Sequence, residues 1–292
     1  MKNSDKLVTI IIGERSNLSY HLFKRLNYAE IFSSALLLQS LVQLSKFREK
    51  KVNVIFNNFQ PSTHLNSFVD PCKYVDLSIS LTLRVLMYLI ESGAIINQII
   101  YSSSCSVYGN VTRGDNYSEV SPIGVPSSLK YINEQILREV CNDYDLKLTI
   151  ARIFNIFGGN DEFSVISKIY NCFINKTKLS VLNDGKSVRD YIHINNIVDV
   201  YEKILLDSSI KLDTIDVGSG LGKSLAEILI YLSNNRFTFD TESSNKNEID
   251  FSQANTSMIK KIIDISTFID VNVYLLDKLK SSGDKNKIDK KT

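Results

Sequence analysis

The chain has 292 residues, of which 43% are hydrophobic, and this length and composition predict either two domains or one large α/β unit with an appended lobe. The formal net charge is +2, and the tail SSGDKNKIDKKT carries four Lys against two Asp, so the rest of the chain is balanced. A balanced chain predicts no nucleic-acid partner, because the protein surfaces that bind nucleic acids are basic.

The four cysteines lie far apart and form no CxxC pair, which predicts reduced thiols rather than a disulfide framework or a zinc site. The N-terminal segment MKNSDKLVTIIIG contains one short apolar run, too short for a membrane span and without a signal-peptide cleavage region. The histidines show no metal-ligand spacing. We therefore expect a cytoplasmic protein with no membrane partner and no metal site.

Apolar runs and helical periodicities alternate along the first half of the chain. The predicted elements are a strand at 7–12, a helix at 18–26, a strand at 30–35, a helix at 36–50, a strand at 52–56, a helix at 75–93, a strand at 97–103, a helix at 129–144 and a strand at 147–155. Strands that alternate with helices indicate βαβ units, so the sequence predicts a Rossmann-like, doubly wound parallel sheet.

The alternation of predicted strands and helices becomes less regular after residue 155. The predicted elements there are helices at 166–176, 224–234, 257–264 and 273–282 and a short strand at 179–184, with an irregular polar stretch at 236–256. We therefore expect a dinucleotide-binding domain over 1–155, a smaller C-terminal α/β substrate lobe over 156–280 that is interleaved with the sheet, and a disordered tail over 281–292.

The turn GERSNLS after the first strand suggests a dinucleotide site, where glycines let the backbone approach a pyrophosphate at a helix N-terminus. Gly13 occupies the first glycine position, but Ser16 and Ser19 occupy the second and third. Arg15 could compensate by pairing with phosphate oxygens. An ordinary βα turn capped by Ser16 or Asn17 is the alternative. The candidate cofactor-binding residues of this turn are Gly13, Arg15, Ser16, Asn17 and Leu18.

The segment YSSSCSVYGN places three serines at the end of a predicted strand. Alone, such a cluster is typical of a polar turn. Five motifs in chain order change this interpretation: IIYSSSCSVYG, LKYINEQIL, ARIFNIFGG, DGKSVRDYIHINNIVDVYEKIL and IDVGSGLGKSLAEIL. Together they resemble the extended short-chain dehydrogenase/reductase family, especially its nucleotide-sugar epimerases, dehydratases and 4-ketoreductases, over roughly residues 7–280.

The resemblance implies a catalytic serine at Ser104, with Ser103 beside it as a substrate contact, and the lysine of the family at Lys130. In the family a tyrosine four residues before the lysine exchanges a proton with a substrate hydroxyl, and the nearby ammonium lowers its pKa. Here that position is Pro126, which has no ionisable group. Lys130 could still hold the cofactor ribose, as it does in the family; a solvated helix residue is the alternative.

Two tyrosines and a bound water are candidates for the missing proton donor. Tyr108 follows Ser104 by four residues, and we take it as a candidate catalytic residue. Tyr131 would project about 100° away from Lys130 on an ideal helix, which disfavours it. A water linked to Ser103 or Ser104 is the third alternative.

The resemblance also implies substrate contacts in the second half of the chain. Arg189 corresponds to the family arginine near the nucleotide-sugar phosphates, and a surface ion pair is the alternative. Asn155 could bind a substrate phosphate or sugar, or cap a strand end. Asp216 stands where the family has Asn, and His193 reads as a packed structural residue.

The cofactor implied is NAD or NADP. No acidic residue follows the predicted second strand, where Ser33 and Ser34 stand, so the preference is open, with a slight tilt towards NADP from Arg15. The short gap before the strand at 52–56 suggests a trimmed second βα unit, in the region that normally holds the adenine ribose.

Two functions follow. The first is an NAD(P)-dependent nucleotide-sugar epimerase or 4-ketoreductase in surface-polysaccharide sugar synthesis. The second is a catalytically inactive relative that binds a nucleotide sugar or a partner subunit. The resemblance further implies a helix-mediated homodimer.

Overall fold

The computed structural model describes residues 6–58, 71–110, 120–207, 209–210, 212–246 and 248–288. The chain divides into two compact units that alternate along the sequence. The first unit contains the described residues within Met1–Gly109, Glu119–Ile153 and Val198–Asp216; the second contains those within Asn110–Ser118, Phe154–Ile197 and Val217–Thr292.

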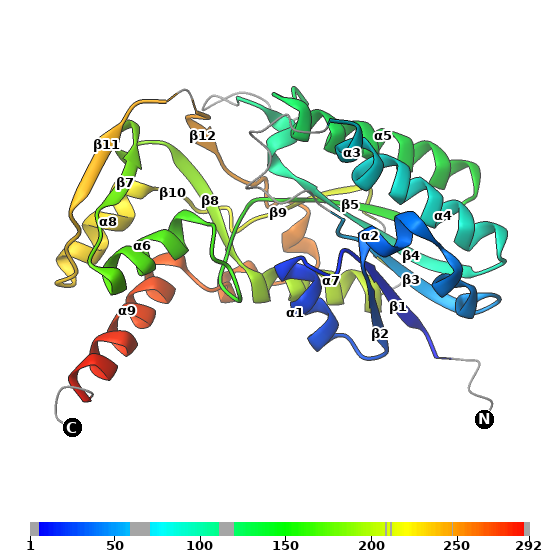
Figure 1. The fold of residues 1–292 in the computed structure, drawn as a ribbon, viewed down its shortest axis with the longest axis horizontal. Coiled ribbons are helices and arrows are strands. Elements are labelled where there is room, and N and C mark those ends of the chain that lie inside the picture. The colour runs from blue at the N-terminus through cyan, green and yellow to red at the C-terminus, as the bar shows by residue number, and fades with distance from the viewer. Residues whose placement is uncertain are drawn as a thin grey trace. The chain divides into compact units, whose positions relative to one another are not determined.

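A six-stranded sheet forms the centre of the first unit (Figure 1). Its strand order is β2 (Ala29–Phe32), β1 (Val8–Ile12), β3 (Lys51–Phe56), β4 (Ile95–Ser104), β5 (Leu148–Ile153) and β9 (Thr214–Val217). The pairings from β2 through β5 are all parallel. The order reverses between β1 and β3, which is where doubly wound sheets bind ligands beyond the carboxyl ends of their strands. The predicted Rossmann-like fold is confirmed.

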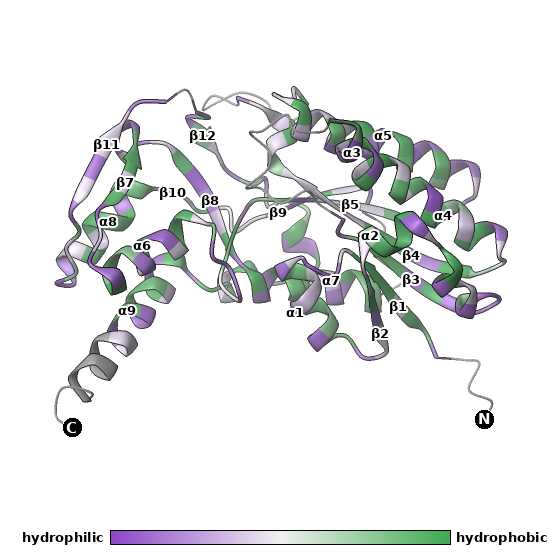
Figure 2. Cartoon of the chain, viewed as in Figure 1, coloured by the Kyte–Doolittle hydropathy of each residue, from purple (hydrophilic) through white to green (hydrophobic). Residues whose placement is uncertain are grey.

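Helices cover both faces of this sheet, as Figure 1 shows. One face carries α4 (Leu81–Glu91) and α5 (Val125–Asp143), and the other carries α1 (Asn17–Arg25) and α7 (Ile194–Leu206). The strands are apolar along their length because both faces are buried, and Figure 2 shows β1 and β3 as mainly hydrophobic. Arg25 of α1 pairs with Asp199 and Glu202 of α7, so these two helices are adjacent.

The second unit contains two smaller sheets and three helices of more than two turns among its described residues. Strand β8 (Val188–His193) lies between β10 (Gly222–Ser224) and β12 (Phe251–Ser252) and also pairs with β6 (Asn155–Phe157). Strand β7 (Leu179–Leu182) pairs with β11 (Thr241–Ser244). Helices α6 (Val165–Asn175), α8 (Leu225–Asn234) and α9 (Val271–Ile288) enclose a separate apolar core.

Several predicted elements differ from the structure. The predicted helix at 36–50 is two pieces, α2 (Ser34–Gln39) and a 3₁₀ helix η1 (Val42–Phe47), because Ser40 is extended and its hydroxyl accepts the N–H of Val42. The predicted helix at 75–93 is composed of α3 (Pro71–Val75), a π turn η3 (Asp76–Ser80) and α4.

The C-terminal part differs as well. Residues 257–264 contain only a short 3₁₀ turn η6 (Ile259–Lys261), followed by a second, η7 (Ile265–Thr267). The polar stretch at 236–256 contributes β11 and β12. Helix α9 continues to Ile288, into the segment expected to be a disordered tail, and residues 289–292 lie outside the described residues.

Strand β2 is the edge of the six-stranded sheet and has only four residues. The chain returns from β2 through α2 and η1 directly to β3, which pairs with β1 on its other side. The second βα unit, which was expected to be trimmed, consists of the four-residue edge strand β2 followed by the short helices α2 and η1. Lys46 of η1 forms an ion pair with Glu30 of this strand, and its ammonium lies 5.3 Å from the ring centre of Phe32.

Candidate functional site

The three serines at the end of β4 have different roles. The Ser102 hydroxyl is paired with the Tyr201 hydroxyl at 2.7 Å, and the Ser103 hydroxyl donates to Glu134 Oε1; both serines are buried. Ser104 is partly exposed, and its Oγ accepts the N–H of Ser106 at 3.2 Å, which caps the 3₁₀ turn η4 (Cys105–Tyr108). A hydroxyl that accepts one bond retains its own proton for donation. Of the three, Ser104 is therefore the one best placed to meet a substrate.

Lys130 lies against the same strand. Its Nζ donates to the carbonyl oxygen of Ser102 at 2.9 Å and lies 5.3 Å from the ring centre of Tyr101. Burial lowers the pKa of the Lys130 amine well below its ordinary value, although the Glu134 carboxylate acts in the opposite direction. Pro126 lies in the first turn of α5, where a missing N–H costs no helical hydrogen bond, so proline is well tolerated at this position.

The surroundings of Tyr108 disfavour ionisation of its phenol. Its hydroxyl donates to Asp216 Oδ1 at 2.6 Å, and the Arg152 guanidinium lies 4.8 Å from the centre of its ring. Burial, followed by the negative charge of Asp216, raises the pKa of the Tyr108 phenol. A phenol in this environment stays protonated near neutral pH, and its proton is already directed at a carboxylate.

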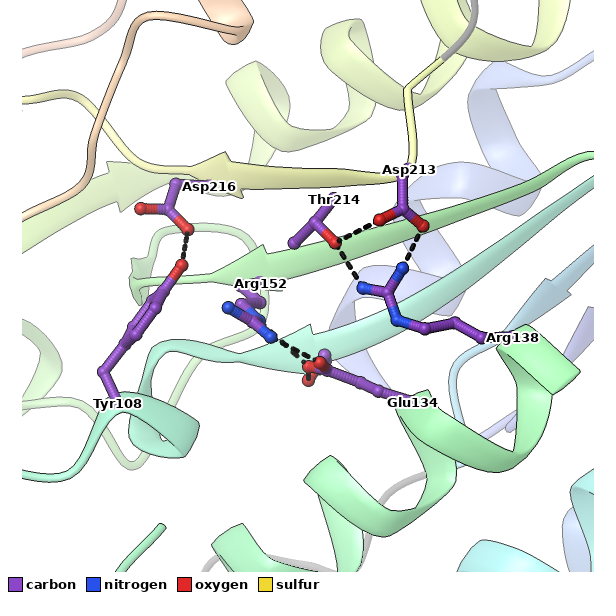
Figure 3. A network of polar contacts seen from close by, with 8 residues as sticks. Tyr108, Glu134, Arg138, Arg152, Asp213, Thr214 and Asp216 are labelled. Atoms are coloured by element: carbon purple, nitrogen blue, oxygen red, sulfur yellow. Dashed lines mark hydrogen bonds and ion pairs between the residues drawn. The ribbon is translucent and has the colours of Figure 1, made fainter. Parts of the chain in front are cut away.

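A buried ion pair of Arg152 and Glu134, shown in Figure 3, contacts the serine cluster through Ser103. Arg152 of β5 donates from Nε to Glu134 Oε1 at 3.1 Å and from Nη2 to Glu134 Oε2 at 2.6 Å, and both side chains are nearly inaccessible. Burial alone would lower the pKa of the Arg152 guanidinium, but the hydrogen bonds and charge of Glu134, together with Tyr108, raise it. The pair joins α5 to β4 through Ser103 and to η4 through Tyr108.

A second contact shown in Figure 3 joins α5 to the start of β9, where Arg138 binds Asp213 and the hydroxyl of Thr214. The Arg152–Glu134 pair is buried and fully paired, so it holds the carboxyl end of β4 from α5 and β5, whereas the Arg138 contact is partly exposed.

The turn after β1 requires glycine at its first residue. Gly13 has a φ of +115°, and a Cβ there would lie 2.3 Å from the carbonyl oxygen of Asn57, so only glycine fits. Ser16 caps α1, and the Asn57 amide donates to Ser16 Oγ at 3.0 Å and to Ser19 Oγ at 2.7 Å. The two serines at the glycine positions are thus bound to the residue that follows β3.

The remaining residues of this turn are divided between surface and core. Arg15 is exposed and Asn17 is the first residue of α1, whereas Leu18 is buried and packs inward, so only its backbone could contact a ligand. The positive end of the α1 dipole therefore lies beside an exposed guanidinium. These residues fit a pyrophosphate at the start of α1, although the Ser16 Cβ restricts its closest approach.

Asn155 and Arg189 lie on paired strands of the second unit. The Asn155 amide donates to the carbonyl oxygen of Asp190 at 3.2 Å. Arg189 donates from Nη2 to Glu248 Oε2 at 3.1 Å and from Nη1 to the carbonyl oxygen of Val188. The structure thus brings Ser103, Ser104, Tyr108 and Lys130 together in the first unit, and Asn155 and Arg189 in the second.

Two neighbours of these residues are structural. The Asp190 carboxylate is fully buried and accepts the N–H groups of Ser219, Gly220 and Ala254 and the Ser219 hydroxyl. His193 packs between the rings of Phe157 and Tyr274, as a structural histidine would.

Comparison with known proteins identifies this arrangement. Residues 12–218 match the model of the NAD-dependent epimerase/dehydratase family. The chain belongs to this family. The match covers the glycine turn, the serine cluster, Lys130 and Arg189, so the resemblance inferred from the motifs is confirmed.

Individual relatives of this family are distant. A UDP-glucose 4-epimerase of Mycoplasma genitalium is 25% identical over 255 residues, which are 78% of this chain and 73% of that protein. The CDP-abequose synthase of Salmonella typhimurium is 28% identical over 137 residues, 44% of this chain and 46% of that protein. The chain spans about half the length of several other curated relatives that it matches.

Solved structures of family members share the fold. The UDP-glucose 4-epimerase of Thermus thermophilus, determined with NAD, has a TM-score of 0.77 at 15% identity and covers 94% of this chain and 99% of its own. A UDP-N-acetylglucosamine 4-epimerase of Methanobrevibacter ruminantium, determined with UDP-N-acetylmuramic acid, has a TM-score of 0.76 at 22% identity and covers 95% and 98%.

Four residues of this arrangement were not singled out from the sequence: Asn57, Glu134, Arg152 and Glu248. Glu134 follows Lys130 by one helical turn, so the spacing could have placed both on one face of α5. Asn57 follows a predicted strand, which is a signal of a ligand-side residue. Glu248 lies in an irregular polar stretch that carries no such signal.

Across the described ranges, no helix is long and apolar enough to cross a membrane.

Proposed function

We propose that this chain binds a nicotinamide dinucleotide and a nucleotide sugar and is an epimerase or 4-ketoreductase, and that reduction of a 4-keto group is the better fit of the two. Its family supports the class. The turn at Gly13, the Ser104 hydroxyl and the position of Lys130 support the retention of both ligands. The relatives include a UDP-glucose 4-epimerase and a CDP-abequose synthase.

The observation that carries the preference is Pro126 at the position of the family phenol. The family phenol takes the proton from a sugar hydroxyl during oxidation and returns it during reduction, so its loss slows both directions of one hydride step by the same factor. An epimerase needs an oxidation and a reduction in every turnover, whereas reduction of a 4-keto sugar needs one step, with water as the proton donor. The missing phenol is therefore needed twice in an epimerisation and once in a reduction.

The chain's own groups would serve this reduction as follows. Ser104 would donate a hydrogen bond to the carbonyl oxygen and hold the water that delivers the proton. Lys130 would bind the ribose or the serine strand, as its contact with the Ser102 carbonyl supports. The nicotinamide, when bound, supplies the hydride. Without a positioned acid, turnover should be slower by about 10²–10⁴-fold than with a phenol.

The test is consumption of NADH or NADPH, followed at 340 nm, with a nucleoside-diphospho-4-keto sugar, together with thermal unfolding in the presence of NAD, NADP and a panel of nucleotide sugars. A dinucleotide at 100 times its Kd should stabilise the fold by about 2.7 kcal/mol. If neither dinucleotide changes the unfolding temperature, the hydride-transfer proposal is wrong.

A catalytically inactive relative is the second candidate. It is favoured by Pro126, which removes the family phenol, and by the hydrogen bond from the Tyr108 hydroxyl to Asp216, which engages the first candidate to replace that phenol. Stabilisation by a nucleotide sugar, with no turnover in either direction, would support this candidate.

We further propose, from the family resemblance, a cytoplasmic role in surface-polysaccharide sugar synthesis. We also propose a homodimer, and light scattering would test this oligomeric state.

A further inference from the structure

The Glu248 carboxylate is held in the second unit as a bound anion would be. Its Oε1 accepts the Ser187 hydroxyl at 2.8 Å and the Asn183 amide at 3.1 Å, and its Oε2 accepts Arg189 Nη2 at 3.1 Å. A guanidinium, a hydroxyl and an amide N–H together are the donor set that proteins use for phosphates and carboxylates. We call Asn183, Ser187 and Arg189 the anion cluster.

A second cation lies beside the anion cluster. Lys223 of β10 is directly opposite Arg189 of β8 in an antiparallel register, so the two side chains share one face of the sheet. Two like charges in this position repel each other, and an acidic partner for each one offsets this repulsion. Lys223 is paired with Asp270, and Arg189 is paired with Glu248. This face therefore carries more positive charge than a single arginine, and it is neutralised by acids from the C-terminal part of the chain.

Glu248 lies in the connection from β11 to β12, which is anchored by the pairing of β11 with β7 and by the Val188 N–H, which donates to the Asp250 carbonyl oxygen at 2.9 Å. It lies between β11, whose four residues are all exposed, and β12, which has two residues. On its N-terminal side the segment is attached by Asn183, whose amide donates to the Lys246 carbonyl at 2.7 Å and whose oxygen accepts the Lys246 N–H at 3.0 Å. The Arg189–Glu248 pair itself is about one-fifth exposed on each side, so water and ions can reach it.

From this geometry we infer that Glu248 is a displaceable internal anion: it occupies the anion cluster in the free protein, and the diphosphate of a nucleotide ligand replaces it at Arg189. The inference rests on the proposed function for the identity of the ligand as a nucleoside diphosphate. A diphosphate carries more negative charge than one carboxylate and can contact Arg189 and Lys223 together, which favours the exchange. Glu248 therefore lowers the affinity for the ligand, and withdrawal of its carboxylate from Arg189 is part of binding.

The test compares the binding of UDP and of inorganic pyrophosphate to wild type, Glu248→Gln and Glu248→Ala by calorimetry at low ionic strength. Removal of the competing charge should tighten UDP binding by about three- to tenfold, which is the range expected of a partly exposed ion pair. The gain should shrink at high salt, because salt screens exposed charges. Two variants are used so that a folding defect in one does not prevent the comparison.

Arg189→Met and the double variant Arg189→Met/Glu248→Gln are the matched controls. Both should bind UDP weakly and equally, since Glu248 acts only through Arg189.

The outcomes separate this inference from the proposed function. UDP binding to wild type that is equal or tighter than to both Glu248 variants overturns the displacement and leaves the nucleotide-sugar function intact, because Glu248 would then be neutral or a direct contact. Unchanged binding in Arg189→Met also overturns it. If no form binds UDP or pyrophosphate while a dinucleotide still stabilises the fold, the nucleotide-sugar part of the proposed function fails, and the displacement fails with it.

Discussion

The buried pair of Arg152 and Glu134 gives a prediction about stability. Replacement of Arg152 by Met removes two hydrogen bonds to the Glu134 carboxylate, at 3.1 and 2.6 Å, and leaves that carboxylate in a site with no exposure to water. The methionine fills most of the arginine stem, so the loss of packing is small. What changes is the compensation of a buried charge.

The expected cost is large. Breaking one partner of a buried pair costs about 3–5 kcal/mol, and two hydrogen bonds to a charged group, at about 1.5–3 kcal/mol each, give a similar total. The free energy of unfolding of Arg152→Met should fall by this amount. The chain has no tryptophan, so urea unfolding is best followed by circular dichroism.

The double variant Arg152→Met/Glu134→Gln is the control. With the carboxylate gone, the remaining amide and the Ser103 hydroxyl can satisfy each other, so the double variant should be more stable than the single variant by about 1–3 kcal/mol. A single variant that loses less than about 1 kcal/mol, or a double variant no better than the single one, would refute the view that an uncompensated buried charge sets the cost.

Three further predictions concern the candidate sites. Pro126→Tyr should raise reductase or epimerase turnover, by up to about 10²–10⁴-fold, whereas Pro126→Phe, which lacks the hydroxyl, should not; equal rates in both variants would place the proton donor elsewhere. Gly13→Ala should destabilise the first unit by about 1–3 kcal/mol and abolish stabilisation by dinucleotides, while Gly93→Ala, with a φ of +78° but no atom closer than 4.0 Å to the new Cβ, should cost less and leave binding unchanged. Burial opposes ionisation of Asp270, but its hydrogen bond to Lys223 and backbone N–H bonds lower its pKa; the stability it contributes is therefore present above about pH 4 and lost as pH falls through the lowered value, and Asp270→Asn should flatten this acid limb in an unfolding series from about pH 2 to 5.

The sequence predicted β1, β3, β4 and β5 because each contains an apolar run typical of a buried strand, whereas β9 was not among the predicted elements. It predicted the helix at 36–50 wrongly, because periodicity cannot show that one serine hydroxyl will compete for a backbone N–H and break the helix at Ser40. Element boundaries in the second unit were also poorly predicted, since β11 and β12 are polar and owe their strand geometry to pairing with β7 and β8.

The candidate site was predictable where a residue type and a spacing carry the chemistry. The positions of Ser104, Lys130 and Pro126 follow from the motifs. The partners of these residues do not, because they come from elements distant in sequence. The link from Tyr108 to Asp216 spans 108 residues, and the link from Arg189 to Glu248 spans 59. The catalytic, cofactor and substrate roles given to the site residues remain predictions.

The short edge strand β2 also affects how the protein avoids self-association. An exposed sheet edge invites pairing with another chain, and proteins commonly protect such edges by keeping them short and charged. Here the edge has only four residues, and the ion pair of Glu30 with Lys46 lies across it. The same shortening that removes part of the nucleotide-side scaffold therefore leaves an edge with little capacity for amyloid-like pairing. Substitutions that remove the charges of Glu30 and Lys46 would leave that edge unprotected. The protein should then lose solubility before its fold changes.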